Sequence, residues 1–326
     1  MSGPLQGGRR RRRVGPLLLV ALVVALPLLA AGGYLYVVRT DDGPGARAQV
    51  VDTPSIDQKG GSLEPRSPAP VHLNGGNAFS LRFSKPPRAA LVFDVDTGDV
   101  LFRDQPERVL PIASLTKIMT ALAVVEETKP DERVRITNAS LNYQGSGVGV
   151  LPRGKDVSLN AMMNGLLLVS GNDAAIALAD HVSGTERRFV GLMNEKARLW
   201  GLRCTHYVSS HGLQKGNRSC AADLAVMARL AMRNPRITSI ARRKEATLRF
   251  PIKGGKLYLY GHNPLIRAGY PGAIGLKTGF TDDAGRCFVG IARRNGRTLG
   301  VVLLHSPNPL AHATKLLDLG FAAKRG

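Results

Sequence analysis

The stretch PIASLTKIMT, residues 111–120, places a serine three residues before a lysine, at the start of an apolar helical pattern. Ser114 and Lys117 are then neighbours one turn apart on a predicted helix. Ser114 alone could be a helix cap. Lys117 does not fit that interpretation, because a capping box has Glu or Gln at this offset and a cation opposes the macrodipole at a helix N-terminus. Spacings of three and four predict one buried helix face, made of Leu115, Ile118, Met119 and Leu122.

The chain is strongly basic, with a formal net charge of +21 over 326 residues. Residues 1–39 contain six arginines and no acid, so 39 basic and 24 acidic residues remain beyond them, a net +15. Such a charge favours an anionic partner, namely a phospholipid surface, a wall polymer or nucleic acid, although a basic bias spread over the surface would give the same total. Aromatic residues make up only 5% and do not alternate with basic ones. We therefore expect no nucleic-acid partner.

The N-terminal region predicts export from the cytoplasm. Residues 1–13 end in five arginines, and residues 14–38 carry no charge over a length that can span a bilayer. This pattern predicts a basic cytoplasmic tail, a single membrane anchor and a body on the extracytoplasmic side. A cleaved signal peptide is the alternative, because AAGG at 30–33 is rich in small residues. Residues 39–78, rich in Gly, Pro and Ser, predict a flexible linker before a domain over 79–326.

The order of elements predicts an α+β fold. Strand patterns at 89–95 and 100–104 flank Asp96-Thr97-Gly98, which we interpret as a hairpin turn because an aspartic protease would need a second such triplet. Helical patterns follow from residue 114 to about 233, with predicted helix caps at Ser158, Thr185 and Ser219. Strands then return until Asn295-Gly296 predicts a last hairpin. A helix closes the chain at 310–323. We expect an antiparallel sheet made from both chain ends, an inserted all-helical subdomain and a cleft between them.

The three cysteines fit an exported chain. Cys204 and Cys220 are predicted to form a disulfide, which would close a small loop. Cys287 lies in the apolar run RCFVGIA and is expected to be a buried free thiol. No cysteine pair has zinc-ligand spacing and no HExxH motif occurs, so no metal site is expected.

Two further short motifs accompany Ser114 and Lys117. Ser170-Gly171-Asn172 lies at a break between two apolar helical patterns, and Lys277-Thr278-Gly279 ends a strand pattern. Each motif alone is typical of a helix cap or an ordinary turn. In the order SxxK, SxN, KTG they form a specific constellation for acyl transfer.

With these motifs, the sequence resembles the serine D-alanyl-D-alanine carboxypeptidases, the low-molecular-mass penicillin-binding proteins. The likeness extends over roughly residues 80–322 and includes PIASLTKIMTALAV, GLLLVSGNDAAIALA, HGL at 211–213 and PGAIGLKTGFTDDAG. It implies the penicillin-recognising fold of β-lactamases and transpeptidases. It also implies hydrolysis of the terminal D-Ala-D-Ala bond of peptidoglycan stem peptides without a cofactor, and inhibition by β-lactams.

The resemblance also assigns roles to residues. Ser114 is the nucleophile and Lys117 its base, with a pKa lowered by burial and by a second cation, Lys277. Ser170 relays a proton to the leaving D-alanine, and Asn172 orients Lys117 and holds a substrate amide. The remaining roles concern the substrate: Lys277 and Thr278 bind its terminal carboxylate, Gly279 leaves room for it, and the backbone N–H groups of Ser114 and Phe280 form the oxyanion hole.

Some features depart from the family pattern. Arg286 stands where a tyrosine is expected, and the sequence ends at Gly326 without the family's frequent β-rich domain and amphipathic C-terminal anchor, so we expect the N-terminal span to anchor the protein. A serine β-lactamase of the same superfamily is one alternative. It would need a glutamate with an asparagine four residues on, and neither Glu186 nor Glu195 has one. A non-catalytic wall-binding protein is the other alternative.

Overall fold

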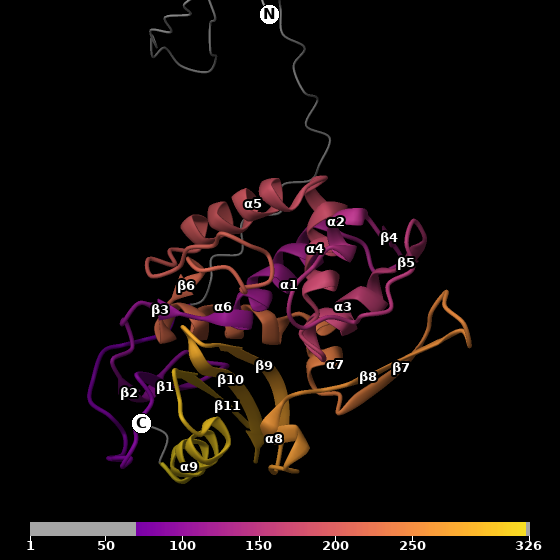
Figure 1. The fold of residues 1–326 in the computed structure, drawn as a ribbon. Coiled ribbons are helices and arrows are strands. Elements are labelled where there is room, and N and C mark those ends of the chain that lie inside the picture. The colour runs from indigo at the N-terminus through magenta and orange to yellow at the C-terminus, as the bar shows by residue number, and fades with distance from the viewer. Residues whose placement is uncertain (1–69, 324–326) are drawn as a thin grey trace, which may run out of the picture. The chain divides into compact units, whose positions relative to one another are not determined.

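The computed structural model describes residues 70–323 and has the predicted α+β architecture (Figure 1). Its main sheet is antiparallel and has five strands in the order β2-β1-β11-β10-β9. Both chain ends contribute to it, because β1 pairs with β11 over the whole of its length. The strands are β1 (Ala89–Asp94), β2 (Val100–Asp104), β9 (Ala273–Thr281), β10 (Gly285–Arg294) and β11 (Arg297–Leu304).

Two turns that the sequence predicts join these strands. Between β1 and β2, a carboxylate oxygen of Asp94 accepts hydrogen bonds from the backbone N–H groups of Asp96 and Thr97, which confirms the hairpin turn. Between β10 and β11, Asn295 and Gly296 have φ values of 48° and 73°. Positive φ at both central residues matches the right-handed twist of the strands, which is why Asn-Gly is favoured in such turns.

The sheet separates two hydrophobic clusters because successive strand side chains point to opposite faces. On one face, Phe93 and Val289 pack with the helical subdomain. On the other face, Val92 and Val301 pack against helix α9 (Pro309–Ala322). Figure 1 shows α9 in yellow beside the sheet, and the inserted helices gathered at its other side.

Helix α1 (Thr116–Glu127) is central to the helical subdomain, with ten of its twelve residues buried, Lys117 among them. Two predicted caps are confirmed, since Ser158 accepts a hydrogen bond from the N–H of Ala161 and Thr185 from that of Arg188. The predicted cap at Ser219 is wrong. Cys220 is the N-cap residue of α6 without a side-chain bond, while Ser219 pairs with Leu110 in a short ladder.

The other helices that the structure describes are α2 (Asn138–Leu141), α3 (Leu159–Leu167), α4 (Asn172–Ser183), α5 (Glu186–Leu199), α6 (Ala221–Arg233), α7 (Pro235–Ala241) and α8 (Pro264–Arg267). Three short ladders complete the described elements: β3 (Leu110–Pro111) with β6 (Arg218–Ser219), β4 (Arg133–Arg135) with β5 (Asp156–Ser158), and β7 (Glu245–Arg249) with β8 (Lys256–Tyr260).

The end of the predicted linker lies against the folded domain. His72 forms a bridge with Asp99 and its N–H donates to the carbonyl of Gly98 at 2.8 Å, and the N–H of Ala78 donates to the carbonyl of Leu101 at 2.7 Å. The predicted basic tail, the span at 14–38 and the linker up to residue 69 lie outside the described residues. Among residues 70–323, no helix has the length and apolar character needed to cross a membrane.

Candidate active site

Ser114 lies in a 3₁₀ turn, η1 (Ala113–Leu115), which immediately precedes α1. Neither the turn nor the helix receives a side-chain cap bond, and the residues before them are Ile112 and Leu115. Ser114 is therefore not a helix cap. Ala113 has a φ of 47°, and its carbonyl accepts a hydrogen bond from the hydroxyl of Thr116 at 2.8 Å, which fixes the turn. The serine hydroxyl is left for chemistry.

Lys117 is fully buried and has three polar neighbours. Its Nζ lies 2.7 Å from Oδ1 of Asn172, 2.7 Å from the carbonyl oxygen of His211 and 3.1 Å from Oγ of Ser114. The first two oxygens can only accept hydrogen bonds. A neutral amine has two N–H groups for them, so its lone pair is left for the hydroxyl of Ser114. This is the geometry of a base that takes the serine proton.

Electrostatics favour that neutral amine. Burial lowers the pKa of Lys117 well below its usual value of 10.5, and the charge of Lys277 lowers it further, while the buried carboxylate of Asp173 acts in the opposite direction. Desolvation disfavours the charged form of a lysine, and a like charge does the same. Burial explains why a lysine is placed where the start of a helix disfavours a cation.

Ser170 lies between α3 and α4, with a φ of 61°. Its Oγ accepts a hydrogen bond at 2.9 Å from Nζ of Lys277, and that same Nζ donates to the carbonyl of Thr278 at 2.9 Å. Lys277 is only 2% exposed, and burial lowers its pKa to about 7. The second and third motifs thus meet directly, and Lys277 is held by protein groups rather than open to solvent.

Strand β9 passes so close to the serine turn that only a glycine fits at position 279. A Cβ there would lie 3.0 Å from the backbone nitrogen of Ser114 and 2.9 Å from the carbonyl oxygen of Ile112. The sequence predicted that this glycine leaves room for substrate. In the structure, the serine turn itself fills the space, so Gly279 sets the distance between the nucleophile and the strand.

A cleft of about 580 Å³ joins these groups. It is bounded by the nucleophile, by the second serine and by the β9 strand, so the helical subdomain and the sheet both contribute to it. The predicted site residues that line it are Ser114, Ser170, Thr278, Gly279 and Phe280. Lys117, Asn172 and Lys277 lie behind this surface and are almost fully buried.

Two backbone hydrogen-bond partners of the site residues were not predicted from the sequence. One is the backbone carbonyl of His211, which accepts from Lys117, and the other is the carbonyl of Gln144, which accepts from Nδ2 of Asn172 at 2.5 Å. Nδ2 carries two N–H groups, so one donor remains after this bond, and the contact of Asn172 with a substrate amide stays a prediction. The HGL motif at 211–213 was the one sequence signal near these contacts.

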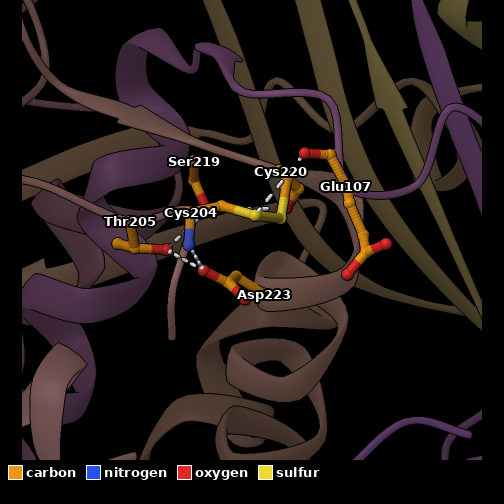
Figure 2. Close-up of a disulfide and its surroundings, with 6 residues drawn as sticks. All are labelled: Glu107, Cys204, Thr205, Ser219, Cys220 and Asp223. Carbon is orange, nitrogen blue, oxygen red and sulfur yellow. Dashed lines mark hydrogen bonds between the residues drawn. A yellow bond between two sulfur atoms is a disulfide. The ribbon is translucent and has the colours of Figure 1, made fainter. Parts of the chain in front are cut away.

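The predicted disulfide between Cys204 and Cys220 is confirmed, with the two Cα atoms 5.5 Å apart (Figure 2). Beside it, Asp223 accepts hydrogen bonds from the N–H of Cys204 at 2.8 Å and from the hydroxyl of Thr205 at 2.7 Å. The bond closes a loop that carries His211, so it constrains the segment that holds Lys117. Cys287 is a buried free thiol, as predicted, and burial raises its pKa to about 11.

Cys204, Cys220 and Asp223 also form the one cluster of potential metal ligands within residues 70–323. Metal ligation by cysteine requires the thiolate. The two sulfur atoms are bonded to each other, so this cluster is a covalent crosslink with a carboxylate beside it.

Comparison with known proteins agrees with this geometry. The family described as D-alanyl-D-alanine carboxypeptidase matches residues 84–308. The carboxypeptidase DacB2 of Mycobacterium tuberculosis is 36% identical over 246 residues, covering 73% of this chain and 83% of that protein. DacF of Bacillus subtilis is 34% identical over 244 residues, covering 72% of this chain and 62% of that protein.

Solved structures give the same result. A D-alanyl-D-alanine carboxypeptidase of Mycobacterium tuberculosis aligns with a TM-score of 0.71 at 34% identity, covering 77% of this chain and 97% of that one. A variant of the DD-transpeptidase of Streptomyces K15 aligns with a TM-score of 0.68 at 30% identity, covering 74% and 100%. The matched region contains all three motifs in their expected order. The chain therefore belongs to the D-alanyl-D-alanine carboxypeptidase family, whose members are serine-type hydrolases.

Proposed function

We propose that this protein removes the C-terminal D-alanine from peptidoglycan stem peptides through an acyl-enzyme on Ser114. One observation carries the proposal: the buried amine of Lys117 donates to two obligate acceptors and keeps its lone pair for the hydroxyl of Ser114. A hydroxyl is a weak nucleophile until a base takes its proton. The family relationship supplies the substrate class.

In the proposed acylation, Oγ of Ser114 attacks the carbonyl carbon of the D-Ala-D-Ala bond while its proton passes to Nζ of Lys117. The backbone N–H groups of Ser114 and Phe280 stabilise the oxyanion. The C–N bond then breaks, and the proton that Lys117 took returns to the leaving amine through the hydroxyl of Ser170, which Lys277 orients. Water next attacks the ester, Ser114 regains its proton and the shortened peptide leaves.

The terminal carboxylate of the substrate is proposed to bind at Thr278, whose side chain borders the cleft. Lys277 acts differently from Thr278 because its Nζ is already bonded to Ser170 and to a carbonyl. The charged ammonium has a third N–H beyond these two bonds, and its charge favours the carboxylate at Thr278. Asn172 is proposed to orient Lys117 through Oδ1 and to hold a substrate amide with the second N–H of Nδ2.

For the cellular setting, we propose a single N-terminal membrane anchor and a catalytic domain on the extracytoplasmic side. Five arginines before 25 uncharged residues support the anchor and its orientation. A disulfide in the catalytic body is consistent with an oxidising compartment. The peptidoglycan substrate lies on that same side of the membrane.

We also propose that β-lactams acylate Ser114 and are released slowly. A class A β-lactamase deacylates through a glutamate, and no glutamate lines the described cleft. Rapid loss of the penicillin adduct from the wild-type protein would favour a β-lactamase over a carboxypeptidase.

The decisive test is Ser114→Ala in the full-length chain, assayed for D-alanine release from a pentapeptide stem and for covalent labelling by a fluorescent penicillin. We expect both to be abolished, because no other group in the proposed mechanism can carry the acyl group. Ser239→Ala, on the exposed side of α7, is the matched control and should retain both. D-alanine release by Ser114→Ala would remove the assignment.

A further inference from the structure

Arg286 is the cationic side chain at the exposed rim of the catalytic cleft. It is exposed, and it lies near the start of β10, directly opposite Phe280 of β9 in the antiparallel pair. Its guanidinium carbon is 5.9 Å from the centroid of the Phe280 ring, and both side chains border the cleft that contains Ser114. This is also the position where the sequence departs from the family pattern.

The guanidinium of Arg286 contacts the Phe280 ring but has no acidic partner within the described part of the protein. It takes part in none of the ion pairs found among residues 70–323. Its nearest acids in the sequence, Asp282 and Asp283, border a separate cleft beside residues 212–217. No carboxylate is found among the described residues that line the catalytic cleft. A guanidinium in this setting is suited to a carboxylate supplied by a ligand.

The position of Arg286 along the cleft indicates which part of a substrate it contacts, if the substrate binds as in the proposed function. Strand β9 is an edge strand, so an extended peptide can lie along it. The proposed anchor for the terminal carboxylate is Thr278, and the proposed oxyanion donor is two residues further on at Phe280, about 7 Å away along a strand. The acyl portion of the substrate therefore continues past Phe280, to which Arg286 is directly opposed.

We propose that Arg286 binds the side-chain carboxylate of an acidic residue immediately before D-Ala-D-Ala, and so determines which stem peptides the enzyme prefers. Arginine suits this role because its planar guanidinium forms two parallel hydrogen bonds to one carboxylate. The ring of Phe280 lies beside the guanidinium and limits its freedom. The favoured substrate class is a stem peptide with a free carboxylate at this position, rather than its amide.

The test compares two peptides that differ only in charge, Nα-acetyl-L-Glu-D-Ala-D-Ala and Nα-acetyl-L-Gln-D-Ala-D-Ala, with the full-length chain. D-alanine release should give wild-type kcat/KM values about fivefold higher for the glutamyl peptide, the upper end of the range for an exposed ion pair. Arg286→Gln should bring this ratio close to one through a loss on the glutamyl peptide. Arg293→Gln is the matched control, because it removes the same charge from an exposed position at the far end of β10 and should preserve the preference.

A third substrate distinguishes the two carboxylates that a stem peptide offers. Nα-acetyl-L-Gln-D-Ala-D-Ala amide lacks only the terminal charge. Suppose that Arg286→Gln removed the preference for the terminal acid over this amide and left the kcat/KM ratio of the glutamyl to the glutaminyl peptide unchanged. That result would show that Arg286 binds the terminal carboxylate, and it would overturn the proposal. The proposal would also be overturned if the wild-type protein released D-alanine from the glutamyl and glutaminyl peptides with nearly equal kcat/KM. Failure of the proposed function gives a different result, because the wild-type protein would then release D-alanine from neither the glutamyl nor the glutaminyl peptide.

Discussion

Gly279 links the geometry of a strand to the position of the nucleophile. Its missing side chain leaves room for the backbone of the serine turn, which approaches the place of a Cβ to within 3.0 Å at the nitrogen of Ser114. That same nitrogen is the proposed oxyanion donor. A single residue therefore controls the separation between the strand along which substrate lies and the group that attacks it.

Gly279→Ala should reduce acylation by a penicillin probe about a hundredfold, because a displacement of about 1 Å at a reacting group has effects of this size. The free energy of unfolding should fall by only about 1–3 kcal/mol, as for other overpacked sites. Stopped-flow labelling and urea denaturation measure the two quantities. Gly191→Ala on α5 is the control, since no atom lies within 4 Å of its added Cβ. Normal acylation by Gly279→Ala would show that the turn adjusts without consequence.

At the scale of elements, the loop closed by the disulfide connects stability to the site. The bonded cysteines are 16 residues apart, and the loop between them carries the His211 carbonyl that accepts from Lys117. Cys220 also immediately precedes α6. The crosslink therefore holds the loop at the N-terminus of α6, a helix that packs against α1.

Replacing both cysteines, Cys204→Ser with Cys220→Ser, should lower the free energy of unfolding by about 3 kcal/mol, the size expected for a loop of this length. It should also slow acylation, because the carbonyl of His211 would be held less firmly. Urea denaturation with and without reductant measures the first effect. The double variant should be insensitive to reductant, and an unchanged wild-type midpoint in reductant would contradict the prediction.

Local chemistry explains which elements the sequence predicts. The turn at Asn295-Gly296 and the caps at Ser158 and Thr185 depend on residues adjacent in the chain. The cap at Ser219 fails because a tertiary contact prevails: its hydroxyl pairs with that of Thr205 at 2.8 Å while its backbone joins a short ladder. The 3₁₀ turn at Ser114 has no side-chain cap that would identify it.

The same distinction applies to the site. The predictable residues are those whose side chains carry the chemistry. The structure brings them together as two bonded groups at one site, Ser114 with Lys117 and Asn172, and Ser170 with Lys277. The carbonyl partners at positions 144 and 211 are not predictable, since every residue type has the same carbonyl group. Only the fold selects which of them points at an amine.

At the scale of the whole molecule, two buried lysines give the folded state a characteristic response to pH. Burial lowers the pKa of Lys277 to about 7 and that of Lys117 well below 10.5. Between pH 7 and pH 10, the unfolded chain binds more protons at these positions than the folded chain. Stability rises with pH wherever the unfolded state binds more protons.

The free energy of unfolding should therefore increase from pH 7 towards pH 9.5, by up to about 1.4 kcal/mol per pH unit for each proton difference. Urea denaturation at fixed ionic strength tests this, and Lys277→Met should show a smaller slope. Above pH 10 the trend should reverse, because burial raises the pKa of Tyr207 and Tyr270 in the folded state. A flat or falling curve for wild type between pH 7 and 9.5 would contradict the prediction.

The hydrogen-bond partners of Lys117 come from three parts of the chain: the adjacent turn before α1 and two distant segments, the start of α4 and the crosslinked loop. Until all three have docked, residue 117 is an ordinary solvated ammonium and residue 114 an ordinary alcohol. Reactivity is thus acquired only when folding is complete. An incompletely folded protein that meets a β-lactam or a stem peptide does not react with it.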